Sequence, residues 1–297
     1  MGQRTGRGAI EWPTMLVGLA VYGGWLAVTA WHMILPWPVL VLAGGWLLAW
    51  HGSLQHETIH GHPTRYRAVN DAIGFMPLAL WLPYAQYRRS HRAHHHAEVI
   101  TDPHHDPESR YRATADGVTD VMDRLRSTLA GQMIFGPPIA IAGFLIGEVR
   151  RVRRDPLEVV RDWVPHLAAV AAVLWWLDHV GLSLGRYILM FVYPGTALTM
   201  LRSYAEHRAD LDSPHRAASV ERGGMLALVF LNNNLHAAHH DRPALAWYAL
   251  PAYHRRHRDR FATQGALTYA GYRDVVRRFA FRPHDQVIHP TYRSPAS

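Results

Sequence analysis

The chain of 297 residues contains no cysteine. A disulfide framework, a thiolate zinc site, an iron–sulfur cluster and a cysteine nucleophile are therefore excluded. Charged residues make up only 18% of the chain, below the usual share in a soluble domain, whereas hydrophobic residues reach 49%. The sequence also lacks a CxxCH haem-attachment motif and any convincing dinucleotide or flavin fingerprint. Electrons for redox chemistry would have to come from another protein.

Long apolar runs occupy much of the chain. Residues 14–35 and 37–55 carry no Asp, Glu, Lys or Arg, and two further apolar runs follow at 163–182 and 184–203. A bilayer crossing takes roughly 20 residues. A signal peptide explains the first run less well, because the second begins almost at once. We expect an all-α integral membrane protein with four transmembrane helices arranged as two hairpins, and Gly23, Gly24, Gly44 and Gly45 suggest close helix approach within the first hairpin.

The run 127–147 could cross the membrane by its length, but it contains Pro137 and Pro138. If it crossed, the histidines near 91–96 and those near 236–240 would lie on opposite faces. We therefore expect it to be re-entrant or interfacial.

The net charge is +8, and arginine-rich segments belong in the cytoplasm by the positive-inside rule. This predicts a bacterial inner-membrane protein with both termini cytoplasmic, one embedded domain over 1–281 and a loose tail over 282–297.

Histidine is the abnormal residue, with 22 copies. Three clusters stand out: HETIHGH at 56–62, HRAHHH at 91–96 and HAAHH at 236–240. On a helix, residues three and four apart share a face, so each cluster can aim imidazoles at a common point. The members at that spacing are His56, His60, His91, His94, His95, His236, His239 and His240.

Neutral imidazole is a good ligand for iron, copper, nickel or zinc. One zinc ion needs about four ligands, so eight histidines suit two metal ions held in a cytoplasmic helical cap. A single histidine is more often a surface or core residue, but three clusters at predicted membrane boundaries reverse that expectation. His62 and His96 point off the shared faces and are candidates for additional ligands only.

The order HxxxH, HxxHH, HxxHH around two helical hairpins resembles the membrane fatty-acid desaturase superfamily, which includes acyl desaturases, lipid hydroxylases and carotenoid ketolases. The likeness covers roughly residues 35–255. It implies a further ligand from the end of the fourth span, where RSYAEH supplies His207. The segment NNNLHAAHHDRPALAWYALP is most similar to the bacterial hydroxylase and ketolase branches.

The resemblance implies a chemistry as well as a ligand set. Two iron ions would use O2 and two electrons to desaturate or hydroxylate an unactivated C–H site of a lipid or acyl chain taken from the bilayer. An external donor, such as a ferredoxin with its reductase, would supply the electrons. A basic cytoplasmic face suits an acidic donor, although attraction to anionic lipids explains the same charge.

Several neighbours of the histidines are candidates for supporting roles. Glu57 and Glu206 could accept the free N–H of a ligand imidazole, or pair with arginines instead. The loop TDPHHDPES, with Asp102, Asp106 and Glu108, could cover the site or dock a partner, and Asp106 is the candidate chosen from it. One of Asn232, Asn233 and Asn234 could bind a metal-linked water, and Asn234 is the candidate chosen among them. Residues that could line a substrate route, or simply pack, are His51, Trp81, Tyr84 and Tyr87.

Other functions fit less well. A membrane transporter or sensor of metal ions would explain the histidines, but transport sites tend to lie at mid-membrane depth on broken helices. Here the histidines begin where the apolar runs end. Nucleic-acid binding is disfavoured because the basic residues are interleaved with spans and no recognised motif occurs. A carotenoid-type hydroxylase or ketolase remains the alternative within the same superfamily.

Overall fold

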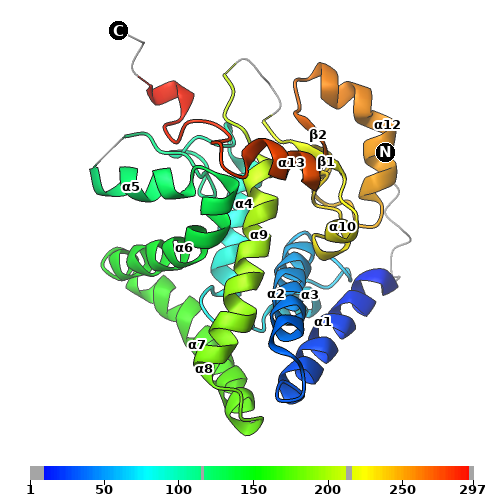
Figure 1. The fold of residues 1–297 in the computed structure, drawn as a ribbon, viewed down its shortest axis with the longest axis vertical. Coiled ribbons are helices and arrows are strands. Elements are labelled where there is room, and N and C mark those ends of the chain that lie inside the picture. Colours follow the sequence, from blue (N-terminus) through cyan, green and yellow to red (C-terminus); the bar gives the residue numbers. More distant parts are fainter. Residues whose placement is uncertain (1–9, 115–116, 212–215, 294–297) are drawn as a thin grey trace. The chain divides into compact units, whose positions relative to one another are not determined.

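The computed structural model describes residues 10–114, 117–211 and 216–293. Within them the chain is mostly helical, with two short strands (Figure 1). It forms two compact units, each described here by itself: unit 1, Met1–Arg88 and Ile141–Leu198, and unit 2, Arg89–Ala140 and Thr199–Ser297. Helices α4 (Tyr84–His96), α6 (Leu129–Val152) and α9 (Tyr193–Glu206) each begin in one unit and end in the other.

Unit 1 begins with α1 (Trp12–Ala30) and α2 (Trp37–Ile59), which lie side by side (Figure 1), followed by α3 (Arg67–Gly74). Pro36 separates the first two helices. Gly24 allows their close approach, because a Cβ added there would lie 2.9 Å from the Leu47 side chain. The close contact that the sequence predicts for the first hairpin is therefore confirmed at Gly24.

The other predicted glycines do not serve the contact between α1 and α2. Nothing lies within 4 Å of a Cβ added at Gly23, and a Cβ at Gly45 would lie 3.0 Å from Pro194. A Cβ at Gly44 would overlap the carbonyl oxygen of Met190 and lie 2.8 Å from the Phe191 ring. Both residues lie in a π-helical turn, η1 (Ile188–Val192), between α8 (Leu184–Tyr187) and α9. Pro194 follows this turn; proline lacks an N–H and crowds the carbonyl four residues earlier, which favours a widened turn. Gly44 thus makes room for a displaced carbonyl rather than for α1.

Polar groups of tryptophan and tyrosine link α1 to the later helices of unit 1. The Trp25 indole N–H donates to the Tyr187 hydroxyl at 2.9 Å, and Tyr187 donates in turn to the Leu78 carbonyl at 2.6 Å. The indole of Trp176, on α7 (Pro156–His179), donates to Thr29 at 2.9 Å. Buried indole and phenol groups need such partners, and here the partners fix how the apolar helices pack.

Among the described residues, α1 and α6 are each long and apolar enough to cross a membrane. The pair Pro156–His179 and Leu184–Glu206 passes the same test only together and is bent by 108°, which gives up to three spans. The four predicted spans are not confirmed, because polar residues such as His51 dilute α2. Helix α6 continues through Pro137 and Pro138, so the segment predicted to be re-entrant or interfacial is one unbroken helix.

Unit 2 contains most of the short elements. They are α5 (Gly117–Arg126), β1 (Ser219–Arg222), α10 (Met225–Val229), α11 (His236–Asp241), α12 (Leu250–Thr263), β2 (Thr268–Gly271), α13 (Tyr272–Phe279) and the 3-10 turn η2 (Pro290–Tyr292). Strands β1 and β2 pair in parallel, with Val220 opposite Tyr269. This small sheet departs from the all-α expectation.

A small apolar core lies beneath the third histidine cluster. Its buried members are Ala217, Leu235, Ala237, Ala238, Leu250 and Phe261. Because Ala237 and Ala238 lie between the histidines of α11, one side of this short helix is buried in the core and carries no ligand.

Residues 282–293, which belong to the segment expected to be a loose tail, contact the rest of unit 2. His284 and His289 are both buried. The backbone of this segment pairs with residue 112, since the Arg112 N–H donates to Val287 at 3.0 Å and the His289 N–H donates to Arg112 at 2.9 Å. The last four residues, 294–297, lie outside the described residues.

Candidate metal centre

The second histidine cluster lies on the last turns of α4. His91 and His95 are four residues apart, and their ring centroids are separated by 4.7 Å; His94 follows on the same face, 5.9 Å from His91. His96 lies off this face, is exposed and has Nδ1 at 2.6 Å from the Arg92 carbonyl. Helical spacing therefore brings together the three residues that the sequence analysis selected and leaves out His96.

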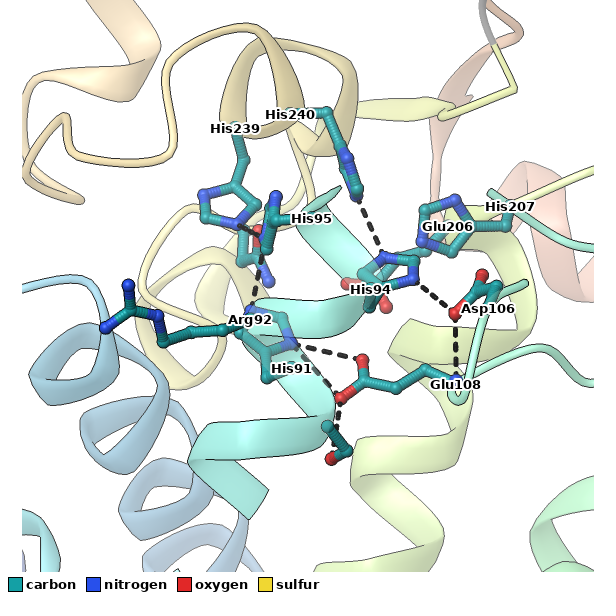
Figure 2. A network of polar contacts seen from close by, with 12 residues as sticks. His91, Arg92, His94, His95, Asp106, Glu108, Glu206, His207, His239 and His240 are labelled. Carbon is teal, nitrogen blue, oxygen red and sulfur yellow. Dashed lines mark hydrogen bonds and ion pairs between the residues drawn. The ribbon is translucent and has the colours of Figure 1, made fainter. Parts of the chain in front are cut away.

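The third cluster lies on α11, which the strand β1 holds in place. The Val220 N–H donates to the Asn234 carbonyl at 2.7 Å, and the Ala237 N–H donates to the Ala218 carbonyl at 3.0 Å. Just before α11 the chain turns sharply, with a positive φ at Leu231 and at Asn232. Such a turn determines the direction in which the helix begins, and the His239 and His240 rings point toward the histidines of α4 (Figure 2). The His236 ring lies 4.6 Å from the His240 ring.

Four histidines form a first group in unit 2: His94, His207, His236 and His240. One ring nitrogen from each lies within 4.8 Å of the others. The Nε2 atom of His236 is 3.0 Å from that of His207 and 3.1 Å from that of His240. His240 Nε2 is 3.2 Å from His94 Nε2. The structure thus places His207, which follows α9, among residues of the second and third clusters.

A second group in the same unit contains His91, His95 and His239, again with ligand atoms within 4.8 Å of one another. His95 Nε2 lies 3.1 Å from His91 Nε2 and 3.0 Å from His239 Nε2. Figure 2 shows the His239 and His95 rings pointing toward each other beside His91. Two neighbouring groups of converging nitrogens match the prediction that two metal ions are held.

Three acceptors fix the proton positions on these rings. The Asp106 carboxylate lies 2.8 Å from His94 Nδ1, and Glu108 lies 3.1 Å from His91 Nδ1. The side-chain oxygen of Asn233 is 3.0 Å from His236 Nδ1. Because these oxygens only accept, each Nδ1 carries the hydrogen and each Nε2 lone pair faces the cluster. That is the tautomer in which imidazole Nε2 binds a metal.

The close nitrogen contacts indicate that a cation fits there. An imidazole lone pair accepts one hydrogen bond, so the contacts of His236 Nε2 to His207 and His240 cannot both be hydrogen bonds. A metal ion at the centre would take an electron pair from every ring at once. Four imidazoles, or three with further ligands, form a donor set suited to a first-row transition metal.

Burial sets the charge of the rings. It lowers the pKa of His207, His236 and His240 well below the ordinary value, and neighbouring imidazoles add to the effect. Burial likewise lowers the pKa of His95 to about 3. These rings are therefore neutral at neutral pH, which is the form that ligates metals.

His94 differs from these rings. Burial acts to lower its pKa, but the hydrogen bond to Asp106 and the nearby carboxylates outweigh burial and raise the pKa above its ordinary value. The environment of His94 thus favours positive charge, whether a proton or a metal ion supplies it. Burial also opposes ionisation of Glu108, yet the adjacent His91 lowers the pKa of this carboxyl, so it stays ionised.

The first histidine cluster belongs to unit 1. The His56 and His60 rings lie at the end of α2 with centroids 4.7 Å apart. Glu57 is buried, with its carboxylate 3.8 Å from His56 Nδ1. His62 instead directs its Nδ1 to Glu11 at 2.8 Å. The predicted pair is therefore formed, and His62 contacts a residue at the start of the chain.

The candidate route residues are also in unit 1. His51 is buried in α2, 3.4 Å from the Tyr22 hydroxyl, and the Tyr84 hydroxyl lies 2.9 Å from that of Thr58. Trp81 packs edge-on against Phe144, and Tyr87 is half-buried. Tyr84 and Trp81 thus contribute to packing between helices.

The predicted supporting residues divide into two kinds. Glu206 lies 3.4 Å from His236 Nδ1, in addition to 2.8 Å from Arg202, and Asp106 orients His94. Asn234, by contrast, donates its amide N–H to the Val220 carbonyl, and it is Asn233 that contacts His236. Glu108 was predicted only as a member of the loop TDPHHDPES, and the structure places its carboxylate 3.1 Å from His91 Nδ1. The conformation of each loop decides which of its side chains contact a ligand histidine, and the spacing of residues in the sequence does not reveal that conformation.

Apolar helices together with a polyhistidine centre define a metal-binding membrane protein. The chain belongs to the fatty acid desaturase family, whose model matches residues 29–272 and so contains all the histidines of both groups. Comparison with curated proteins returned no match. The membership confirms the resemblance drawn from the histidine spacing.

Proposed function

We propose that this protein is a membrane-bound oxidase that holds two iron ions and uses O2 to desaturate or hydroxylate an unactivated C–H site of a lipid or acyl chain. Desaturation converts CH2–CH2, O2, two electrons and two protons into CH=CH and two waters. Hydroxylation converts C–H with the same co-substrates into C–OH and one water. The observation that carries the proposal is the convergence of imidazole Nε2 atoms in two adjacent groups.

The proposed ligands follow the histidine groups. His94, His207, His236 and His240 would hold one iron. The second iron would be held by His91, His95 and His239 of unit 2, and the family resemblance implies His56 and His60 as its further ligands. When bound, such a pair of irons activates O2 for attack on an aliphatic C–H bond. No thiolate is needed, which agrees with the absence of cysteine.

The remaining work of the site falls to the groups that orient the ligands. Asp106 and Glu108 hold the Nδ1 hydrogens of His94 and His91, and Asn233 holds that of His236. These contacts keep the Nε2 lone pairs directed inward, and ionised carboxylates strengthen imidazole as a donor. Burial of the rings excludes water from the centre.

The substrate would enter from the bilayer, since apolar helices make up much of unit 1. His51, Trp81, Tyr84 and Tyr87 are the proposed lining of its route. The site and both termini would face the cytoplasm of a bacterial inner membrane. Reporter tags near residue 115 and at the C-terminus should then lie on the same side; opposite sidedness would show that α6 crosses and would overturn this arrangement.

An external donor would supply the electrons, for example a ferredoxin with its reductase. Arginines on the outer faces of α12 and α13 would attract an acidic donor by electrostatic steering. Exposed examples are Arg255, Arg256, Arg273 and Arg277. Turnover supported by a soluble acidic donor should therefore fall steeply as ionic strength rises.

The test is oxidation by iron-loaded protein in lipid, supplied with O2 and an electron donor. We expect an O2-dependent product that carries a new double bond or hydroxyl group. His94→Ala should abolish it, whereas His96→Ala, whose ring lies off the ligand face, should retain it. Carotenoid substrates belong in the same assay, because the segment around the third cluster is similar to hydroxylase and ketolase branches. Binding of iron without oxidation of any lipid would contradict the proposal and favour metal transport or sensing.

A further inference from the structure

The segment 282–293 is attached to the loop that carries Asp106 and Glu108. These two carboxylates orient His94 and His91, so the conformation of the loop decides how the ligands point. We define the acidic loop as residues 97–112 and the C-terminal strap as residues 282–293. All of both segments lies in unit 2.

Asp106 is the centre of the acidic loop. Besides the His94 ring, its carboxylate accepts the backbone N–H of Thr101 and that of Glu108, each at 2.8 Å. Thr101 has a positive φ of 85°, which is unfavourable for a β-branched residue. A loop held in such a conformation needs contacts from outside itself.

The strap supplies those contacts at Thr101. His289 is fully buried, and its Nδ1 accepts the Thr291 N–H at 3.3 Å. The hydrogen is therefore on Nε2, which lies 3.2 Å from the Thr101 hydroxyl and donates to it. A continuous chain of hydrogen bonds runs from His289 through Thr101 and Asp106 to the His94 ring.

Two further contacts attach the strap to the same loop. The Tyr292 hydroxyl donates to the Asp102 carboxylate at 3.0 Å, and the Asp102 backbone carbonyl accepts the Asp106 N–H at 2.8 Å. Asp285 contacts the Arg110 guanidinium at 3.2 Å and accepts from the Tyr111 hydroxyl. The strap thus binds the acidic loop at two places, Thr101 with Asp102 and Arg110 with Tyr111.

The strap also reaches the segment that carries His207. The Tyr111 hydroxyl, which donates to Asp285, accepts the Ala209 N–H at 2.9 Å. The Tyr204 hydroxyl accepts the His284 N–H at 2.9 Å. Tyr204 and Ala209 lie on either side of His207 in the sequence, so the strap contacts one flank of this ligand directly and the other through Tyr111.

From these contacts we infer that the C-terminal strap is a positioning element of the metal centre: it holds the acidic loop and the flanks of His207 so that the ligand rings converge. The inference rests on the proposed metal site but concerns residues outside the histidine clusters. It assigns positioning roles to His289, Tyr292 and Asp285, and gives the last part of the chain a function beyond stability.

The test measures Co²⁺ binding by the full-length protein in detergent, by metal content and by absorption of the bound ion. We expect His289→Ala and Tyr292→Phe each to lower Co²⁺ affinity by roughly threefold to tenfold. This is less than the roughly 10- to 100-fold typical of residues that contact a ligand directly, because His289 and Tyr292 act through the acidic loop. The absorption band should also change, because the ligand geometry relaxes. His289→Gln, which keeps an N–H donor, should restore much of the affinity.

Gln286→Ala is the matched control, since this side chain lies in the strap and is exposed. It should bind Co²⁺ as the wild type does. Wild-type affinity and spectrum in both His289→Ala and Tyr292→Phe would overturn the inference. If His289→Ala fails to fold, Tyr292→Phe decides, because it removes a single hydroxyl group from a half-exposed site.

Amide hydrogen exchange separates this inference from the proposed function. In metal-free protein, Tyr292→Phe should speed exchange of the Thr101 and Glu108 amides, which donate to Asp106. Failure of the wild type to bind Co²⁺ or iron would contradict the proposed function alone. Unchanged exchange in the variant would contradict the role of the strap, whatever the metal content.

Discussion

The two histidine groups of unit 2 are alike in ligand type but differ in how firmly their supporting carboxylates are held. Asp106, behind the first group, is buried and accepts three hydrogen bonds at 2.8 Å. Glu108, beside the second group, has a side chain 29% exposed and lies 3.1 Å from its histidine. The carboxylate behind the first group is therefore buried and firmly held, whereas the carboxylate beside the second group is partly exposed and held by fewer contacts. This difference suggests that the second group is the one that can adjust its ligands.

The largest effect should come from removing a ligand. His94→Ala removes one of four imidazoles from the first group, and His239→Ala removes one of the three imidazoles that unit 2 supplies to the second. We expect each variant to lose metal from its own group, and oxidation to disappear in both, while the protein remains in the membrane. Elemental analysis of the purified variants measures the loss. Full metal content in either variant would show that the ligand assignment is wrong.

Asp106→Asn should have the next largest effect. The substitution keeps the shape of the side chain but removes the negative charge that accepts three N–H hydrogen bonds. The His94 ring and the acidic loop therefore both lose support. We expect metal affinity to fall roughly 10- to 100-fold, as is typical when the partner of a ligating histidine is changed. Titration with a chelator measures this affinity, and an unchanged value would show that Asp106 has no part in the site.

Glu108→Gln should have a smaller effect, because its carboxylate is partly exposed and water can replace it. A reduction of roughly threefold to tenfold in metal affinity is expected, within or below the range for such partners. The same chelator titration compares it with Asp106→Asn. An effect larger than that of Asp106→Asn would reverse the comparison between the two groups.

Asn233→Ala should have the smallest effect of the series. It removes the acceptor at 3.0 Å from His236 Nδ1, but the Glu206 carboxylate lies 3.4 Å from the same nitrogen and can take over. We expect metal affinity to change by about threefold or less, because the ring keeps a hydrogen-bond acceptor. Combining it with Glu206→Ala, which removes the second acceptor, should then produce a much larger loss than either change alone. If the losses of metal affinity in the two single variants simply added in the double variant, Glu206 would not replace Asn233 as the acceptor.

Helical spacing explains why the ligands could be predicted from the sequence. Residues three and four apart share a face in any α-helix, so His91, His94 and His95 converge regardless of the surrounding fold. His207 came from the family resemblance, because a single histidine after a helix has no spacing signal.

The supporting residues could not be predicted in this way. Asp106, Glu108 and Asn233 lie in loops, and the conformation of a loop depends on distant contacts such as that of His289 with Thr101. The choice of Asn234 over Asn233 shows the limit, since adjacent residues point in different directions. The expected four spans are not confirmed either, because polar residues lower the mean hydropathy of α2 and the chain bends by 108° between Pro156–His179 and Leu184–Glu206.

The most direct test is the metal content of wild-type protein expressed with iron-57 and purified in detergent, measured by elemental analysis together with Mössbauer spectroscopy. The account predicts about two iron ions per chain that are magnetically coupled, because two adjacent groups of imidazole nitrogens are present. A single zinc ion per chain, or no iron after growth in iron-replete medium, would contradict it.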